Sequence, residues 1–217
     1  MSSLNDLEVR LRDLSHNTDA LQIIQEFAAT FKKTKQRQEV FNRPGALVRP
    51  PILYTEVRER NLIAPEEDAF SLLQGDIVGT EAAYFMGERL VDRRFLVANS
   101  TCDLVPERRN YAVLLPLQRI HPGETSEEQA STKQLLAELL SFKSTRRIYL
   151  PPLPHDPEDV IANAVEFDGF AQIRSVDLLL AERIASLSLT GWRMFASHLR
   201  GVLTRTSESE VKLRASQ

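Results

Sequence analysis

Two short apolar runs, at residues 95–98 and 111–117, constrain the fold of this 217-residue chain more than any other feature. They read FLVA and YAVLLPL, and a polar segment separates them. Apolar runs bounded in this way are typical of strands. Because they lack the alternation of a strand with one solvated face, the sequence predicts strands that are either buried on both faces or curled into a small barrel.

Helices are expected over residues 3–41, ahead of these strands. Apolar residues recur at helical spacing over 4–14 and again over 21–31. Ser3 is placed to cap the first helix, with Asp6 three residues further on. The spacing predicts an amphipathic helical arm whose apolar stripe needs something to pack against.

Three more helices are expected later in the chain. A short one is predicted over 64–73, and a longer one is inserted between strands within 123–144. Ser126 and Gln129 form a capping box for that insertion. A final helix begins at Thr190, which is placed as its cap.

The proline-rich segment 43–54 marks a domain boundary, because proline excludes helix and suits an extended linker or an edge strand. The sequence therefore divides into an N-terminal helical arm and linker, 1–45, a main domain, 46–205, and a flexible tail, 206–217. Further strands are expected in the main domain over 74–87, 93–100, 146–154, 163–177 and 183–189.

Composition excludes several classes of protein. A net charge of −3 argues against indiscriminate electrostatic binding to nucleic acid or to an anionic membrane. The single cysteine, Cys102, excludes an intramolecular disulfide and suits a reducing compartment. The N-terminus is charged where a secretion signal is apolar, and no apolar run approaches the ~20 residues of a membrane span. The sequence predicts a cytoplasmic protein that does not contact a membrane.

Four motifs in one order resemble the MazF/PemK family of toxins. They are 75-GDIV-78, 93-RRFLVANS-100, 111-YAVLLPLQRI-120 and 172-QIRSVDLLLAERIASL-187, followed by a terminal helix. The resemblance covers roughly residues 73–203 and is interrupted by the 123–144 helix. It implies an α+β fold: a small, curled, antiparallel SH3-like β-barrel of MazF/PemK type, with a helical insertion, a C-terminal helix and an N-terminal helical arm.

The same resemblance implies a chemistry. Such toxins are metal-independent endoribonucleases, which stabilise a phosphate transition state with a cation and need a hydroxyl nearby. The family's catalytic arginine falls on Arg93, and Arg94 takes the place of the family's proline. The family's catalytic serine or threonine falls near Gln118, which has no hydroxyl, so Ser100 or Thr101 would have to supply it.

Three Arg-Arg doublets each precede an apolar strand run. One member of each could point to a shared surface and bind phosphates, with Tyr84, Tyr111 or Tyr149 stacking bases beside it. The alternative is that these arginines are solvated or paired with carboxylates. Beside the candidate catalytic Arg93, the candidate binding residues are Arg94, Asp103, Arg108, Arg109, Gln118, Arg146 and Arg147.

The segment 99–109 places a hydroxyl, a thiol and a carboxylate side by side. Asp103 places a negative charge beside Cys102 and no histidine is close in sequence, which argues against a nucleophilic thiol and favours a packed, buried one. Asp103 itself is expected to tie down the loop by accepting backbone hydrogen bonds or by holding an arginine.

The sequence predicts neither a metal site nor a cofactor. The nearest approach to a metal-binding cluster is His155 with Asp156 and Asp159, in a proline-rich loop without metal-ligand spacing.

Two functions remain open at this point. One is a nucleic-acid-linked, RNA-binding or RNA-cleaving relative of the toxins that uses Arg93. The other is a non-catalytic interaction module that binds a protein partner, or a second copy of itself, through residues 3–41.

Overall fold

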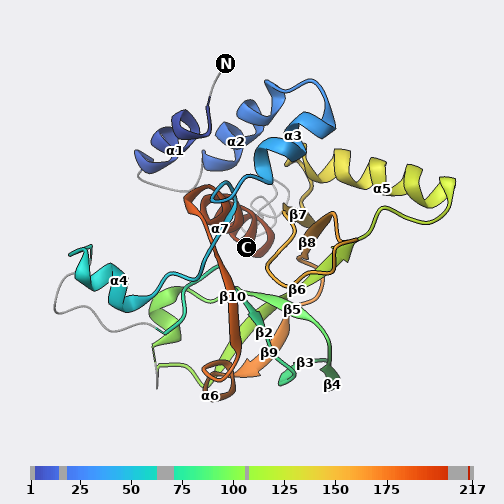
Figure 1. Ribbon diagram of the computed structural model, residues 1–217. Coiled ribbons are helices and arrows are strands. Elements are labelled where there is room, and N and C mark those ends of the chain that lie inside the picture. Colours follow the sequence, from blue (N-terminus) through green and yellow to red (C-terminus); the bar gives the residue numbers. More distant parts are fainter. Residues whose placement is uncertain (1–2, 15–18, 63–70, 106–107, 205–214, 216–217) are drawn as a thin grey trace.

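The protein has an α+β fold, seen here in a computed structural model that describes residues 3–14, 19–62, 71–105, 108–204 and 215 (Figure 1). The ten strands of these described residues form one antiparallel sheet with the order β1-β10-β2-β5-β6-β9-β3-β4, while β8 pairs with β6 and with β7. The strands are β1 Val48–Arg49, β2 Asp76–Gly79, β3 Ala83–Phe85, β4 Glu88–Leu90, β5 Arg94–Val97, β6 Tyr111–Ile120, β7 Arg147–Leu150, β8 Ala162–Glu166, β9 Ala171–Arg174 and β10 Glu182–Leu187.

The sheet is open, so the expected α+β class is confirmed but the expected barrel is not seen. The two end strands, β1 and β4, do not pair with each other in the described part of the chain. The reason lies in β6, whose residues 111–114 pair with β9 while its residues 117–120 pair with β8. Because β6 pairs with a different strand at each of its ends, the sheet divides into two arms, one through β9 and one through β8, and does not close into a ring.

The two apolar runs are buried on both faces, as predicted, except at the start of the second run, where Tyr111 is exposed. Successive side chains of β5 point to opposite faces of the sheet, where Leu96 joins a large core and Phe95 a smaller one. Both residues have no exposed surface. On β6, Leu115 belongs to the larger core and Leu114 to the smaller one. The sheet thus separates two hydrophobic clusters. The larger one continues into the N-terminal helices and the C-terminal helix, while the smaller one includes Leu178 of a short helix.

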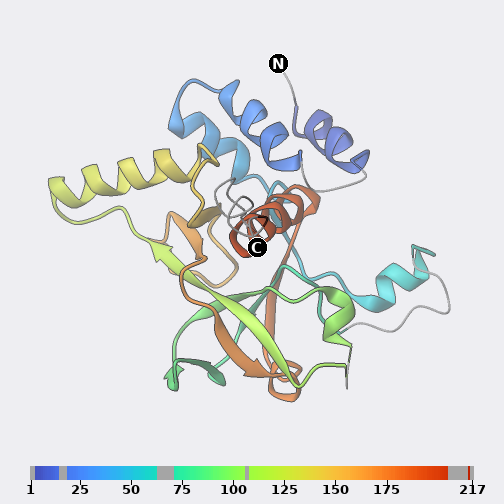
Figure 2. The same cartoon turned by 180° about the vertical axis from the view of Figure 1, so that it is seen from behind.

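The helices of the described residues are α1 Leu4–Arg12, α2 Ala20–Ala29, α3 Thr34–Phe41, α4 Tyr54–Glu59, α5 Ser126–Leu139, α6 Ser175–Leu178 and α7 Leu189–Leu203, with a 3₁₀ turn, η1, at Thr101–Leu104. The N-terminal helices and α7 lie at one end of the sheet, as both views of the ribbon show, whereas α6 lies at the opposite end (Figures 1 and 2). No helix of the described residues is long and apolar enough to cross a membrane.

The N-terminal helices pack against the rest of the chain. Leu11, Ile24 and Phe41 are fully buried and belong to the larger core, together with Phe195 of α7. Polar contacts add to this packing, since the Tyr149 hydroxyl donates to the side chain of Asn42 at 2.5 Å. The stripe that could have bound a partner is therefore covered within the chain itself.

Helix starts differ from the sequence prediction in two places. The Ser3–Asp6 capping box is confirmed. The insertion helix α5 is capped by Thr125 with Glu128, because Thr125 takes the extended conformation that a cap requires. Ser188 caps α7, and the expected cap Thr190 is buried in its first turn. The helix expected over 64–73 lies mostly outside the described residues.

One buried histidine of α7 makes stability depend on pH. The ring nitrogens of His198 lie 2.8 Å from the Ser144 carbonyl and 3.1 Å from the Met194 carbonyl. Burial lowers the pKa of His198 below its ordinary value, although both carbonyls oppose the shift. The unfolded chain therefore takes up this proton first, and the stability that His198 contributes is lost as pH falls below about 6.5.

Replacing His198 with glutamine is expected to reduce that loss. Urea unfolding at about pH 7 and about pH 5 should show a smaller drop in the free energy of unfolding for the variant than for the wild type. Carboxylates elsewhere titrate equally in both proteins and cancel in the comparison. An equal drop in both would show that His198 is not responsible.

Candidate functional site

Arginines from three strands meet where β5 and β7 begin and where β6 ends. Arg93 and Arg94 at the start of β5, Arg119 near the end of β6 and Arg147 at the start of β7 line two adjoining hollows of about 950 and 470 Å³. The two hollows share Asp92, Arg93, Arg94 and Arg119, so they are treated as one site, the arginine hollow.

Strand register explains why these residues meet. Phe95 of β5 lies opposite Pro116 of β6, and the strands are antiparallel. The residues just before Phe95 therefore lie beside those just after Pro116, which brings Arg93 and Arg94 next to Gln118 and Arg119. Arg147 of β7 lies near the same residues because β8 pairs with both β6 and β7.

Asp156 holds two of the arginines in place. Its carboxylate is almost fully buried, accepts a hydrogen bond from Arg94 Nη1 at 2.9 Å and lies 3.4 Å from Arg119 Nε. The second carboxylate oxygen accepts from the Leu153 backbone N–H at 2.7 Å and from Asn163 Nδ2 at 2.8 Å. A buried carboxylate with this many donors fixes the direction of both guanidinium groups.

Arg93 differs from the other arginines of the hollow in having no ion pair with the described residues. Arg94 and Arg119 are held by Asp156, and Arg147 is paired with Glu166 at 3.0 Å. Arg93 is exposed and forms no ion pair with the described residues. Because its guanidinium group is not committed elsewhere, it can bind an incoming anion in a bidentate way.

Carboxylates limit how much negative charge the hollow can accept. Asp92, Glu81 and Glu182 line its larger part, and Glu166 lines the smaller one. Asp92 and His155, which both line the hollow, have positive φ, at 53° and 62°. Left-handed backbone is tolerated best by such residues and often occurs at functional sites. The hollow suits a ligand that places only a few of its anionic groups there and also offers hydrogen-bond donors.

Sequence reasoning missed several residues of the hollow. Arg119 adjoins the candidate Gln118 and could have been found from it. Asp156 was considered only with His155 and Asp159 as a metal cluster, whereas it faces arginines, and Asp159 pairs with His121 at 2.8 Å. No group of three potential metal ligands occurs in the described part of the chain.

Ser100 and Thr101 lie away from Arg93, at the other end of β5. They line a separate hollow of about 490 Å³ with Gln74, Asp76 and Trp192. The Thr101 hydroxyl accepts a hydrogen bond from the Gln74 backbone N–H at 3.1 Å. The structure therefore does not bring these hydroxyls together with the candidate catalytic arginine. Thr80 provides the one hydroxyl among the residues that line the arginine hollow.

The loop at Cys102 is closed by its own residues. The Arg109 Nε donates to Asp103 at 3.2 Å, and Arg108 Nη1 donates to the Cys102 carbonyl at 3.1 Å. The expected role of Asp103 in holding an arginine is confirmed. The expected burial of Cys102 is wrong, because the residue lies in the exposed turn η1. Arg146 also lies apart from the hollow and pairs with Asp168 through its Nε at 2.9 Å.

Comparison with known proteins adds no identity: no family model, no curated protein and no solved structure matches this chain. The assignment of a function depends on the chemistry of the site.

Proposed function

We propose that the protein binds single-stranded RNA through the arginine hollow, as a distant relative of the MazF/PemK toxins. The observation that carries the proposal is the meeting of four arginines from three strands, one of which, Arg93, is exposed and forms no ion pair with the described residues. The same proposal includes an SH3-like arrangement of the strands and a role like that of a toxin–antitoxin protein, as in this family.

The chemistry of the hollow favours RNA over a simple anion. Guanidinium groups bind phosphate oxygens, and Gln118 offers both a donor and an acceptor to a base edge. Single-stranded RNA exposes those edges, whereas the edges of duplex RNA are largely inaccessible. The four carboxylates around the rim would disfavour a long, evenly charged duplex, because like charges would then face each other.

The proposal is for binding rather than cleavage. Gln118 cannot act as the family's hydroxyl, and Ser100 and Thr101 lie in another hollow. The Thr80 hydroxyl already accepts a hydrogen bond from the Ala82 backbone N–H at 3.1 Å, which holds it in a turn. Cleavage of RNA by the wild-type protein would contradict this part of the proposal.

Replacing Arg93 with alanine is expected to weaken RNA binding about tenfold. The loss of one phosphate contact should also reduce the slope of log affinity against log salt by about 0.7. Fluorescence anisotropy with a labelled single-stranded RNA of about 12 nucleotides, at several salt concentrations, measures both quantities.

Arg12→Ala serves as the matched control. It removes the same charge from an exposed position of α1, at the helical end of the molecule. Its affinity should stay within about twofold of the wild type, because only close phosphate contacts release counterions. Equal affinities for the Arg93 variant, the Arg12 variant and the wild type would refute the proposed site.

A further inference from the structure

One face of the sheet is left open beyond the helices, and it carries two exposed tyrosines. Tyr111 of β6 lies opposite Arg174 of β9, and Tyr84 of β3 lies opposite Gln172 of β9. Residues opposite each other in an antiparallel pair project from the same face, and so do residues two apart on one strand. All four side chains, with Arg89 opposite Tyr84 on β4, therefore share one surface, the tyrosine face.

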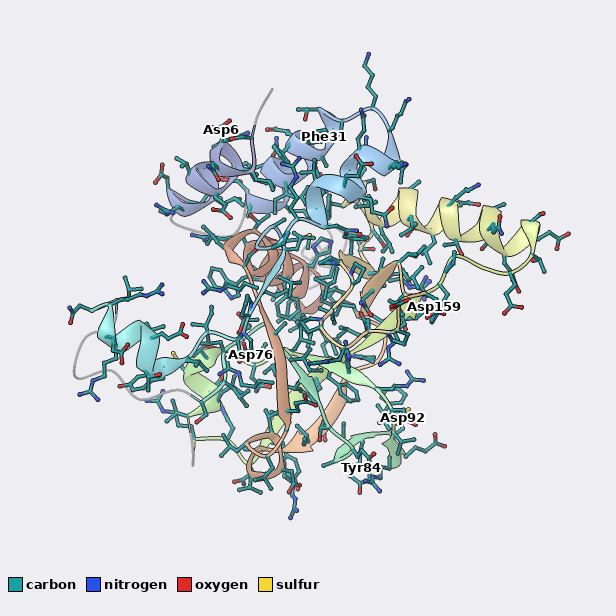
Figure 3. All side chains as sticks on the ribbon, in the orientation of Figure 1. Asp6, Phe31, Asp76, Tyr84, Asp92 and Asp159 are labelled. Atoms are coloured by element: carbon teal, nitrogen blue, oxygen red, sulfur yellow. The ribbon has the colours of Figure 1, made fainter. Side chains whose placement is uncertain are left out.

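The tyrosines of this face are not part of a core. Tyr111 is 59% exposed and Tyr84 49%, while their neighbours Ala112 and Ala83 are buried on the opposite side of the sheet. Tyr84 lies at the end of the molecule farthest from the N-terminal helices (Figure 3). The third tyrosine that the sequence suggested for stacking, Tyr149, is fully buried and takes no part.

Arginines lie next to both rings. Arg174 lies directly opposite Tyr111, and it is two residues along β9 from Gln172, which lies opposite Tyr84. Hydrogen bonds and charge from Asp177 raise the pKa of Arg174. Arg174 pairs with Asp177, and Arg89 pairs with Glu81 at 2.9 Å. These pairs engage only the edges of the guanidinium groups, whose side chains remain 65% and 53% exposed. Their planar faces stay available for stacking.

The spacing of the rings matches an extended strand of nucleic acid. Tyr84 and Tyr111 are separated by two strand spacings across the sheet and two residues along it, or roughly 12 Å. The strand positions between them are occupied by Gln172 and Arg174, not by apolar residues. Tyr111 also lines a hollow with the exposed residues Val176 and Leu179. The two rings themselves are separated by amide and guanidinium groups, and this arrangement suits separate bases better than one contiguous apolar contact with a protein.

The tyrosine face adjoins the arginine hollow through the β3–β4 hairpin. Glu81, which pairs with Arg89 of the tyrosine face, also lines the hollow, and so does Asp92, which follows β4. One RNA strand could therefore contact both surfaces in succession.

We infer that the tyrosine face stacks bases of the single-stranded RNA whose phosphates contact the arginine hollow, with one base on Tyr84 and another on Tyr111. This inference rests on the proposed function and adds to it a second contact surface and a minimum ligand length of several nucleotides. Stacking on tyrosine is tolerant of sequence, so the tyrosine face would add affinity more than base specificity.

The test uses the full chain and the labelled RNA described above. Tyr84→Leu and Tyr111→Leu are each expected to weaken binding about tenfold, because leucine keeps apolar bulk but cannot stack. Their salt slopes should match the wild type, since no phosphate contact is lost. Tyr84→Phe and Tyr111→Phe, which keep the aromatic ring, should bind within about twofold of the wild type. Thermal melting of each variant checks that the fold is intact.

The outcomes separate the two proposals. If the leucine variants bind as the wild type does while Arg93→Ala binds weakly, the tyrosine face is not a stacking surface but the arginine hollow still binds RNA. If the leucine variants change self-association and leave RNA binding unaltered, the face is a protein contact and the inference is overturned. If the wild type binds no RNA, both proposals fail.

Discussion

Replacing Gly191 with alanine is expected to lower the free energy of unfolding by about 3 kcal/mol. A Cβ at this position would lie 2.1 Å from the Leu47 carbonyl oxygen, which is backbone and cannot rotate away. That carbonyl is fixed by a hydrogen bond from the Ser188 N–H at 2.9 Å, and the Ser188 hydroxyl donates to the Ala46 carbonyl at 2.8 Å. The first turn of α7 could accept the methyl group only by moving away from the segment next to β1.

Gly201 of the same helix provides the control. A Cβ there meets nothing within 4 Å, so alanine should stabilise the protein by up to about 1 kcal/mol through its higher helix propensity. Urea unfolding of the two single variants and the wild type measures the contrast. Equal effects of the two substitutions would mean that α7 does not pack closely against residues 46–47.

Replacing Arg183 with methionine is expected to cost about 3–5 kcal/mol, because it leaves a buried carboxylate without its cation. Asp76 is fully buried and lies 2.8 Å from Arg183 Nη2. It also accepts hydrogen bonds from the Ser186 hydroxyl at 2.5 Å and from the Leu73 N–H at 2.8 Å. Arg183 donates in addition to the carbonyls of Ile52 and Ser71, so its loss also loosens two loops.

The pH dependence of this loss distinguishes the charge from the packing. Burial raises the pKa of Asp76, and hydrogen bonds and Arg183 oppose that shift. Without Arg183 the folded-state pKa rises further above the unfolded value of about 3.9, so the folded variant gains stability as pH falls. The difference between variant and wild type should therefore shrink from about pH 7 toward about pH 4. Adding Asp76→Asn to the variant should recover part of the loss at neutral pH. A difference independent of pH would mean that packing alone is responsible.

Local patterns were enough to predict most elements of the fold. The apolar runs of β5 and β6, the extended proline-rich segment that contains β1 and the capping box of α1 all follow from neighbouring residues. The open shape of the sheet does not, because the branching of β6 depends on pairing with β8 and β9 far along the chain. Short motifs that resemble those of a family predict the order of the strands along the chain, but they do not determine whether the sheet closes into a barrel.

The candidate site could likewise be predicted only in part, because some of its contacts join residues that lie far apart in the sequence. The arginine doublets mark positions where guanidinium groups could gather, and two of the three doublets contribute to the hollow. Asp156, which orients Arg94, lies 62 residues away from it in sequence, so no local pattern reveals the pair. The exposure of Cys102 likewise depends on a turn whose conformation the residue type does not determine.

The branching of β6 also has a consequence for how the chain folds. Pro116, which has no N–H to donate, lies between the residues that pair with β9 and those that pair with β8, and it faces Phe95 of β5. Neither arm can assemble until β6 is in place, whereas β6 and β5 are close in sequence and can meet early. The transition state for folding is therefore expected to centre on these two strands, with the pairing of β2 and β10 formed late because it closes a long loop.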